Sequence, residues 1–318
     1  MLITALILTA VEGLFVLLAR RLGIGAPPSH RSSPSHRRFT PTAGGIVFLV
    51  ALYIFALTDA TGLSGRFWLM FAGANILCIV SFADDLKPLP PVPRLIVQIL
   101  VMALAFNHLC YPEAFYMFLL VLLCGVGFIN ALNFLDGITG MLALYGFVVM
   151  MTLVYAFHCT DVAGAGLFMR MGTLQLIALA VFAAFNLAGR VFAGDTGSIT
   201  LGFIITYMLA TLMLETRDAS YLVFIMVCIC DTGLTTLQRL FAGENILLPH
   251  RQNIYQTLVN RFGMAETAVA LIYALLQLLI NSLFFQIPHS QRWTFFIVIG
   301  IALVTLYFII RQAARRHR

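Results

Sequence analysis

Charged residues are scarce in this 318-residue sequence. Only 10% of its residues are Asp, Glu, Lys or Arg, whereas 61% are hydrophobic and the mean hydropathy is +0.97. Soluble globular chains carry about 25% charged and roughly 45–50% apolar residues, and a chain this poor in polar residues cannot cover a surface exposed to water. The composition therefore excludes soluble enzyme folds, disordered chains, coiled coils and fibrous repeats.

Lysine and patterned cysteine are also missing. The 19 basic residues are arginines with a single exception, Lys87. The six cysteines are scattered through apolar stretches without the spacing of a metal site or a disulfide framework, so we interpret them as small buried hydrophobes. The two-residue alternation of a membrane β-barrel is absent as well. The fold class that remains is an all-α integral membrane protein.

The sequence does contain continuous apolar runs of about the length that a membrane-crossing helix needs, roughly 17–25 residues. We predict eleven transmembrane helices in a single membrane-embedded domain, residues 1–318. The first run lacks a basic start and a cleavage site, so we expect a retained helix and not a signal peptide. The predicted spans are 1–19, 44–58, 67–82, 94–109, 114–129, 138–157, 172–189, 199–214, 219–237, 265–286 and 293–311.

The arginines give these helices an orientation. Eleven passes place the two termini on opposite sides, and all but four of the 19 basic residues fall on the side of the C-terminus; the four are Arg66, Arg170, Arg217 and Arg292. Because cytoplasmic loops carry an excess of Lys and Arg, we predict an outside N-terminus and a cytoplasmic C-terminus. The polar connections 20–43, 83–93, 130–137, 190–198 and 238–264 all lie on the cytoplasmic side, which predicts a functional site there.

Two adjacent acids, Asp84 and Asp85, follow an apolar run, with Lys87 two positions later. Two carboxylates at a membrane boundary are costly unless they bind a cation or a basic group. Acids contribute little to topology, so we favour a functional pair over solvated boundary charges. Lys87 is a candidate phosphate ligand or only part of the basic excess on this side.

Asn130, Asn133 and Asp136 recur every three residues, which places three polar side chains near one helical face among apolar neighbours. Gly137 and Gly140 then permit a break or a close backbone approach. Ordinary helix capping does not require three aligned polar groups. We therefore interpret this face as functional.

Residues 194–198, Gly-Asp-Thr-Gly-Ser, precede an apolar run. At a helix start this pattern offers free backbone N–H groups and the positive end of the helix dipole, which together can bind an anion. Ser198 as an N-cap with the glycines in a turn is the plain alternative. Asp195 could hold Mg²⁺ against a bound anion, since Mg²⁺ takes one or two carboxylates plus phosphate oxygens.

Three further features stay open between two interpretations. The segment 250–256, which begins with His250 and Arg251, supplies donors for phosphate or sugar hydroxyls, but a surface helix explains its composition equally well. The loop 29–45 partly serves orientation, although its Thr-Pro-Thr-Ala-Gly-Gly end is unusual for a stop signal. Asp231 lies inside an apolar run. It is either a functional acid or a structural hydrogen-bond partner of a neighbouring helix.

In this order, the motifs resemble those of the polyprenyl-phosphate N-acetylhexosamine-1-phosphate transferases, glycosyltransferase family 4, a membrane superfamily that includes phospho-MurNAc-pentapeptide transferase. The resemblance covers nearly the whole chain. The segments 30–33 and 250–256 are most similar to the branch that initiates O-antigen or other surface polysaccharides. The motifs are Thr40-Pro41-x-x-Gly44-Gly45, Asp84-Asp85, Asn130-x-x-Asn133-x-x-Asp136-Gly137, Gly194-Asp195-x-Gly197-Ser198 and the His250 loop.

The resemblance implies a Mg²⁺-dependent enzyme of the bacterial inner membrane, with Mn²⁺ as an alternative metal. It would transfer a HexNAc-1-phosphate from a UDP-sugar to undecaprenyl phosphate and release UMP, at the first membrane step of lipopolysaccharide, surface polysaccharide or cell-wall glycan synthesis. Its partners would be UDP-N-acetylhexosamine, undecaprenyl phosphate and membrane lipid, without nucleic acid; a homodimer stays open.

The resemblance also implies a role for individual residues. Asp195 would bind the metal. Asp84, Asp85 and Asp136 would be catalytic, with Asp85 a candidate general base. The substrate-binding residues would be Asn133, Gly137, Phe192, Lys87, His250 and Arg251, with Phe192 stacked on uracil.

The sequence departs from the family pattern at two positions. Thr139 stands where a second acid is common, and Asn253 stands where the similar branch usually has a second histidine. An altered donor or an inactive family member is therefore an alternative. The rival from another class is a transporter or lipid-handling protein that binds a phosphorylated solute. The absence of internal repeats and the polar groups at the boundary disfavour transport.

Overall fold

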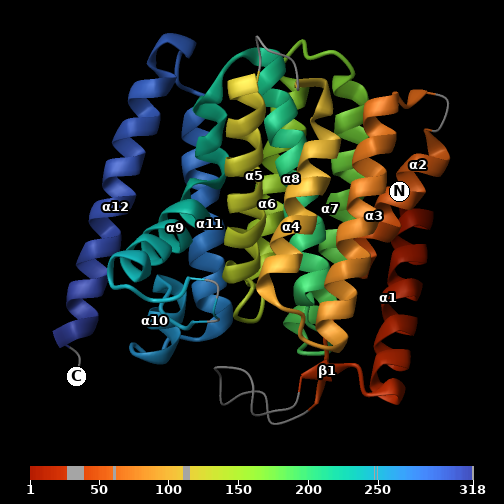
Figure 1. Ribbon diagram of the computed structural model, residues 1–318, viewed down its shortest axis with the longest axis horizontal. Coiled ribbons are helices and arrows are strands. Elements are labelled where there is room, and N and C mark those ends of the chain that lie inside the picture. The colour runs from red at the N-terminus through yellow and green to blue at the C-terminus, as the bar shows by residue number, and fades with distance from the viewer. Residues whose placement is uncertain (27–38, 60–61, 110–114, 247, 249, 317–318) are drawn as a thin grey trace.

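The computed structural model describes residues 1–26, 39–59, 62–109, 115–246, 248 and 250–316. These residues form helices that stand side by side, with α1 and α12 at opposite edges (Figure 1). The strands β1 (Gly25–Ala26) and β2 (Thr40–Pro41) pair antiparallel. The helices are α1 (Leu2–Leu22), α2 (Ile46–Thr58), α3 (Gly65–Leu86), α4 (Pro91–Ala105), η2 (Asn107–Leu109), α5 (Phe115–Leu135), α6 (Met141–His158), α7 (Ala165–Leu187), α8 (Gly194–Thr216), η4 (Ala219–Ile225), α9 (Met226–Phe241), α10 (Ile254–Asn260), α11 (Glu266–Phe284), η5 (His289–Gln291) and α12 (Arg292–Arg316).

Within the described residues, nine helical segments are long and apolar enough to cross a membrane, with η4 and α9 together forming one of them. The prediction of an all-α, multi-pass membrane protein is confirmed. Each of the eleven predicted apolar runs coincides with a helix, but α2 and α4 are only 13 and 15 residues long. The count of eleven spans and the orientation of the termini therefore stay predictions.

Helix α8 lies at the centre of the bundle, packed against α2, α3, α5 and α6. It is buried along nearly its whole length, whereas α12 buries only Leu303, Tyr307 and Ala314. A helix satisfies its own backbone hydrogen bonds, so a fully apolar one can be buried on all sides. The start of α8 is thereby held in the middle of one end of the bundle.

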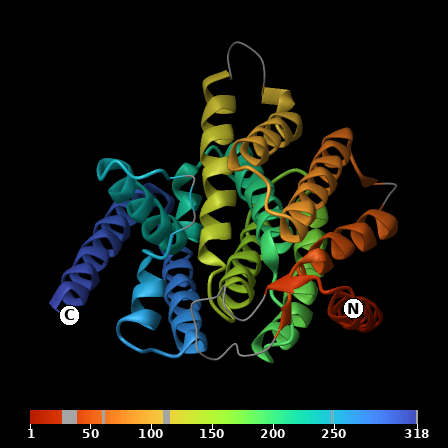
Figure 2. The same cartoon turned by 60° about the horizontal axis from the view of Figure 1, so that its bottom comes forward.

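That end carries β1, α10 and the last turn of α12 (Figure 1), and Figure 2 brings it forward. We call it the β1 end. Gly45, just before α2, lies directly against Gly197 in the first turn of α8, and a Cβ on Gly45 would overlap the Gly197 backbone. The N–H groups of Gly44 and Gly45 donate to the carbonyls of Phe192 at 2.9 Å and Ala193 at 3.2 Å. The Gly-Gly motif thus fixes the segment that leads into α8.

Candidate active site

Four helices bring polar side chains together at the β1 end. Arg94, in the first turn of α4, forms ion pairs through one nitrogen, Nη1, with two carboxylates. One is Asp84 near the end of α3, and the other is Asp195 in the first turn of α8, whose Oδ2 lies 2.6 Å from Nη1. Asn133 of α5 donates to Asp195 Oδ1 at 3.0 Å and to Ser198 Oγ at 2.9 Å. We call Asp84, Arg94, Asn133 and Asp195 the carboxylate cluster.

Asp85 takes a different position from its neighbour Asp84. Its carboxylate accepts hydrogen bonds from the backbone N–H groups of Asp195 at 3.0 Å and Thr196 at 2.9 Å, and from Thr196 Oγ1 at 2.6 Å. The first amides of a helix have no partner within it, and a negative charge there is stabilised by the helix dipole. Asp85 is therefore a cap for α8 that comes from another helix.

This arrangement corrects two expectations for the start of α8. The backbone N–H groups of Asp195 and Thr196 are not free to bind an anion, because Asp85 accepts from both of them. Ser198 does not cap the helix either: it lies inside α8, and its hydroxyl donates to the carbonyl of Gly194 at 2.9 Å. The anion-binding interpretation of this turn was wrong because the protein's own carboxylate takes that place.

Asp231 belongs to a second polar network that fixes α10. Its carboxylate accepts from two backbone N–H groups at the start of α10, at 2.6 and 3.3 Å, and from the hydroxyl of Tyr273 at 2.7 Å. The structural interpretation of this acid is thereby confirmed. On α10, Tyr255 donates to the carbonyl of Phe134 at 2.8 Å, and Gly137 leaves room for its ring, since a Cβ there would overlap the Tyr255 hydroxyl.

His250 lies beside the end of α5. Its ring meets the ring of Phe134 edge-on, with centroids 5.5 Å apart, and its Nδ1 accepts the backbone N–H of Gln252 at 3.4 Å. Burial, together with the charge of Arg239, lowers the pKa of His250 to about 4, so the ring is neutral at pH 7. Its Nε2 has no hydrogen-bond partner among the described residues. Arg251 follows it and is exposed.

The other predicted site residues outside α10 and its loop are Lys87, Asp136 and Phe192. Lys87 is exposed and ends α3. Asp136 follows the end of α5 and is half-buried. The side chain of Phe192 is only 3% exposed, so it would have to be uncovered before it could stack on uracil. The similarity at residues 30–33 lies outside the described residues.

The two departures from the family pattern have structural roles here. The backbone N–H of Thr139 donates to Glu266 Oε2 at 2.9 Å, which ties the turn after α5 to α11. Asn253 directly precedes α10, and its backbone N–H donates to Gln256 Oε1 at 3.2 Å. Its side chain also donates to the carbonyl of Phe134 at 3.3 Å. Both residues therefore help to hold the turn after α5 and the start of α10.

The chain is similar in sequence to known proteins. Residues 67–213 match the family model described as glycosyl transferase family 4. Over these residues the chain is similar to members of this family. It is 23% identical over 328 residues to a probable undecaprenyl-phosphate N-acetylglucosaminyl 1-phosphate transferase of Bacillus subtilis, covering 97% of this chain and 88% of the relative. Two phospho-N-acetylmuramoyl-pentapeptide-transferases are also similar. That of Deinococcus radiodurans is 27% identical over 64% of this chain and 72% of the relative. That of Streptococcus suis is 29% identical over 63% of this chain and 66% of the relative.

The part that matches the glycosyl transferase family 4 model extends from α3 to nearly the end of α8. It contains every member of the carboxylate cluster, as well as Asp85 and Asp136. The Gly44-Gly45 support and the His250 loop lie outside it. The family match thus includes the four helices whose polar ends meet at the β1 end, together with α6 and α7.

Arg94 is the residue of the cluster that sequence reasoning missed. Its position in the sequence indicates only one of the basic residues of the predicted cytoplasmic side. A signal was present, since Pro91-Val-Pro93-Arg94 places an arginine in the first turn of a helix, ten residues after Asp84. Cations are usually unfavourable at a helix start because of the dipole, so an arginine there suggests acidic partners from elsewhere in the fold.

Proposed function

We propose that this protein transfers an N-acetylhexosamine-1-phosphate from a UDP-sugar to undecaprenyl phosphate and releases UMP, in the bacterial inner membrane. The observation that carries the proposal is the carboxylate cluster, which gathers two acids, an arginine and an amide at the ends of four membrane helices. The relatives named as transferases of this kind support it.

The reaction requires charge control more than covalent chemistry. An oxygen of the lipid phosphate attacks the β-phosphorus of the UDP-sugar, and the new P–O bond forms as the P–O bond to UMP breaks, with the electron pair leaving on UMP. Both reactants are anions, so positioning and neutralisation provide most of the catalysis. Arg94 supplies a permanent positive charge at the site, and guanidinium groups bind carboxylates and phosphates alike.

Mg²⁺ fits the donor set of the same cluster, with Mn²⁺ as an alternative. Asp84 and Asp195 approach one nitrogen of Arg94, and the amide of Asn133 lies beside Asp195. Mg²⁺ is usually held by one or two carboxylates, with waters and substrate phosphates as its other ligands. Within the described residues no three acids, histidines or cysteines gather around one point. Asp84 and Asp195 would therefore hold the ion, which would neutralise the diphosphate.

Asp85 positions α8 and does not transfer a proton, because three donors of α8 already occupy its carboxylate. His250 is close to the end of α5, where the Nε2–H of its neutral ring can donate a hydrogen bond to a sugar hydroxyl. For the pathway, we propose the first membrane step of lipopolysaccharide, another surface polysaccharide or a cell-wall glycan. The Bacillus subtilis relative supports a UDP-N-acetylhexosamine as donor.

The test measures UMP release by the purified protein in vesicles, with undecaprenyl phosphate and a panel of UDP-N-acetylhexosamines. We expect UMP only when both substrates and Mg²⁺ are present, and a lipid-linked sugar phosphate in equal amount. Asp195→Asn should abolish release at low Mg²⁺. If no donor in the panel yields UMP, the enzyme proposal is wrong, and a binding or transport role is favoured.

A further inference from the structure

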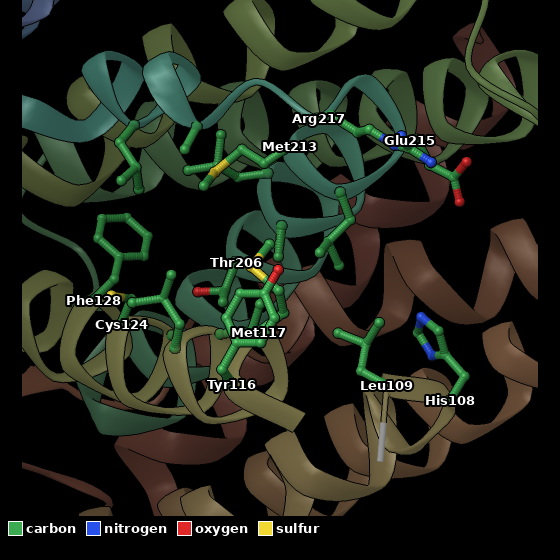
Figure 3. Close-up of a pocket in the computed structure, with 18 of the residues that line it drawn as sticks. His108, Leu109, Tyr116, Met117, Cys124, Phe128, Thr206, Met213, Glu215 and Arg217 are labelled. Carbon is green, nitrogen blue, oxygen red and sulfur yellow. The ribbon is translucent and has the colours of Figure 1, made fainter. Parts of the chain in front are cut away.

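A second site lies at the end of the bundle opposite the carboxylate cluster. A cavity of about 710 Å³ opens there between η2, α5, α8 and η4. Figure 3 shows its two sides: His108, Glu215 and Arg217 lie on one, and Cys124 and Phe128 on the other. Arg66, at the start of α3, also lines it. The cavity thus combines a charged rim with an apolar interior.

The pairing of the arginines distinguishes this rim from the rest of that end. The sequence places four arginines at that end of the bundle, and acids neutralise two of them. Arg170 pairs with Asp59 at 2.7 Å, and Arg292 pairs with Asp218 at 3.0 Å. The side chains of Arg66 and Arg217 make no ion pair or hydrogen bond with another described residue. Both of these unpaired arginines line the same cavity.

The cavity also opens sideways, along the outer face of α5. Tyr116 is 70% exposed and Leu120 is 49% exposed, and both line it; Cys124, one turn further, is exposed as well. In a membrane these α5 side chains face the hydrocarbon region. An acyl chain of a neighbouring lipid can therefore enter the cavity from the side. The headgroup of that lipid stays at the level of the helix ends, where Arg66 and Arg217 lie.

This cavity is too far from the carboxylate cluster to share a phosphate with it. Asp195 is in the first turn of α8 and Arg217 directly follows its last residue. At 1.5 Å per residue, the 23 residues of this helix span about 35 Å. A lipid whose headgroup lies beside Arg217 is therefore a second lipid, with its headgroup in the other leaflet from a phosphate bound at the cluster.

We propose that the cavity lined by Arg66, Arg217 and α5 binds an anionic membrane phospholipid, with its phosphate at the two arginines and an acyl chain in the apolar interior. Each basic group near an anionic lipid surface contributes about a fivefold preference. Glu215 on the same rim offsets part of the charge. We therefore expect an anionic lipid to be selected over a zwitterionic one by roughly fivefold.

Fluorescence quenching by brominated lipids tests the proposal, independently of any transferase activity. The parent carries Leu120→Trp as the reporter, and both native tryptophans, Trp68 and Trp293, are replaced by Phe. The protein is placed in vesicles that contain brominated phosphatidylglycerol or brominated phosphatidylcholine at equal fractions. We expect phosphatidylglycerol to quench the reporter with an association constant roughly fivefold higher.

The charge variants decide where the preference arises. Arg66→Gln with Arg217→Asn should reduce the ratio to near one; Asn is chosen because Arg217 has a φ of 55°, which Asn tolerates. Arg170→Gln is the matched control, since it removes a paired arginine at the same end, and it should leave the ratio unchanged. Thermal unfolding of each variant checks that it is folded.

Three outcomes would overturn the proposal. One is equal quenching by the two lipids in the parent. Another is an equal loss of preference in the Arg170→Gln control, which would show a general charge effect. The third is relief of quenching by undecaprenyl phosphate to the same extent with and without Arg66 and Arg217, because the cavity would then hold the chain of that lipid and not a phospholipid.

Discussion

Replacing Asp85 by Asn should destabilise the protein more than the same replacement of its neighbour Asp84. Asp85 accepts three hydrogen bonds from the first turn of α8. Asn has one acceptor oxygen, and its amide NH₂ would face at least one of these donors. The variant therefore keeps the shape of the side chain but loses its charge and part of its hydrogen bonding.

The magnitude follows from these contacts. A hydrogen bond to a charged group is worth about 1.5–3 kcal/mol, and the interaction of a charge with a helix start adds about 0.3–1 kcal/mol. Asp85→Asn should thus lower the free energy of unfolding by about 2–4 kcal/mol. Asp84 accepts the backbone N–H of Leu89 through Oδ1 at 2.5 Å, a contact that the oxygen of Asn can keep. Its other oxygen pairs with Arg94, whose side chain is 28% exposed, whereas that of Asp84 is 9% exposed. Arg94 keeps Asp195 as a partner when Asp84 is replaced, and a partly solvated pair is worth up to about 1 kcal/mol. Asp84→Asn should cost no more than this.

The assay compares stability and turnover for both variants. Unfolding in mixed micelles with increasing SDS gives the free energy, and UMP release gives the rate. Asp84→Asn should retain its stability and lose activity on the order of 10²-fold, the typical effect of removing one electrostatic group from an active site. Asp85→Asn should lose stability, with a rate per folded molecule closer to that of the parent.

A double-mutant cycle tests the contact itself. Thr196→Val removes the hydroxyl that donates to Asp85 at 2.6 Å and should cost about 1 kcal/mol in the parent. It should cost much less in the Asp85→Asn background, since contacting residues are energetically coupled. The role of Asp85 as a cap is refuted if Asp85→Asn unfolds at the same SDS fraction as the parent but has no turnover. Asp85 would then act in catalysis, as a general base does.

Three further predictions concern the cluster, its support and the His250 loop. Arg94→Gln should lower the maximal rate but tighten Mg²⁺ binding, because two carboxylates lose their cation. UMP release should then be half-saturated at a lower Mg²⁺ concentration, and half-saturation at a higher concentration would contradict this. Gly45→Ala should destabilise by roughly 1–3 kcal/mol or more, whereas Gly300→Ala, where nothing lies within 4 Å, should not. The pKa of His250 in the folded protein is about 4, below the usual 6.5, so the unfolded chain binds a proton more readily. The free energy of unfolding should therefore fall as the pH falls from 6.5 to 4. A His250→Gln variant should lack that part of the decline in melting temperature.

The sequence predicts the helices well for a physical reason. Backbone groups in lipid must pair within their own helix, so every crossing needs a long apolar run that is visible without tertiary information. The two short helices, α2 and α4, show the limit of this rule. Their apolar runs extend into residues 44–45 and 106–109, which the fold uses for a turn against α8 and for η2. Contacts with other segments, and not hydrophobicity, set those ends.

The site is predicted only in part, because its partners are distant in the sequence. Asp84, Asn133 and Asp195 stand out as acids and amides beside apolar runs. Nothing local shows that Asp85 reaches across 110 residues to the start of α8, so the N–H groups there look free. Glu12, in the middle of α1, was missed altogether: it is fully buried, and neither of its carboxylate oxygens has a hydrogen-bond partner among the described residues.

Arginine shows most clearly why partners, and not positions, decide function in this fold. A topology rule counts every arginine alike, but charge that is already neutralised attracts little else. Arg170 and Arg292 are held by acids, and Arg94 is shared by two acids of the cluster. Arg66 and Arg217 have no acidic partner among the described residues and meet at one cavity. Their charge is the part that stays available to an anionic lipid, which is why the lipid site is expected there and not at the other two.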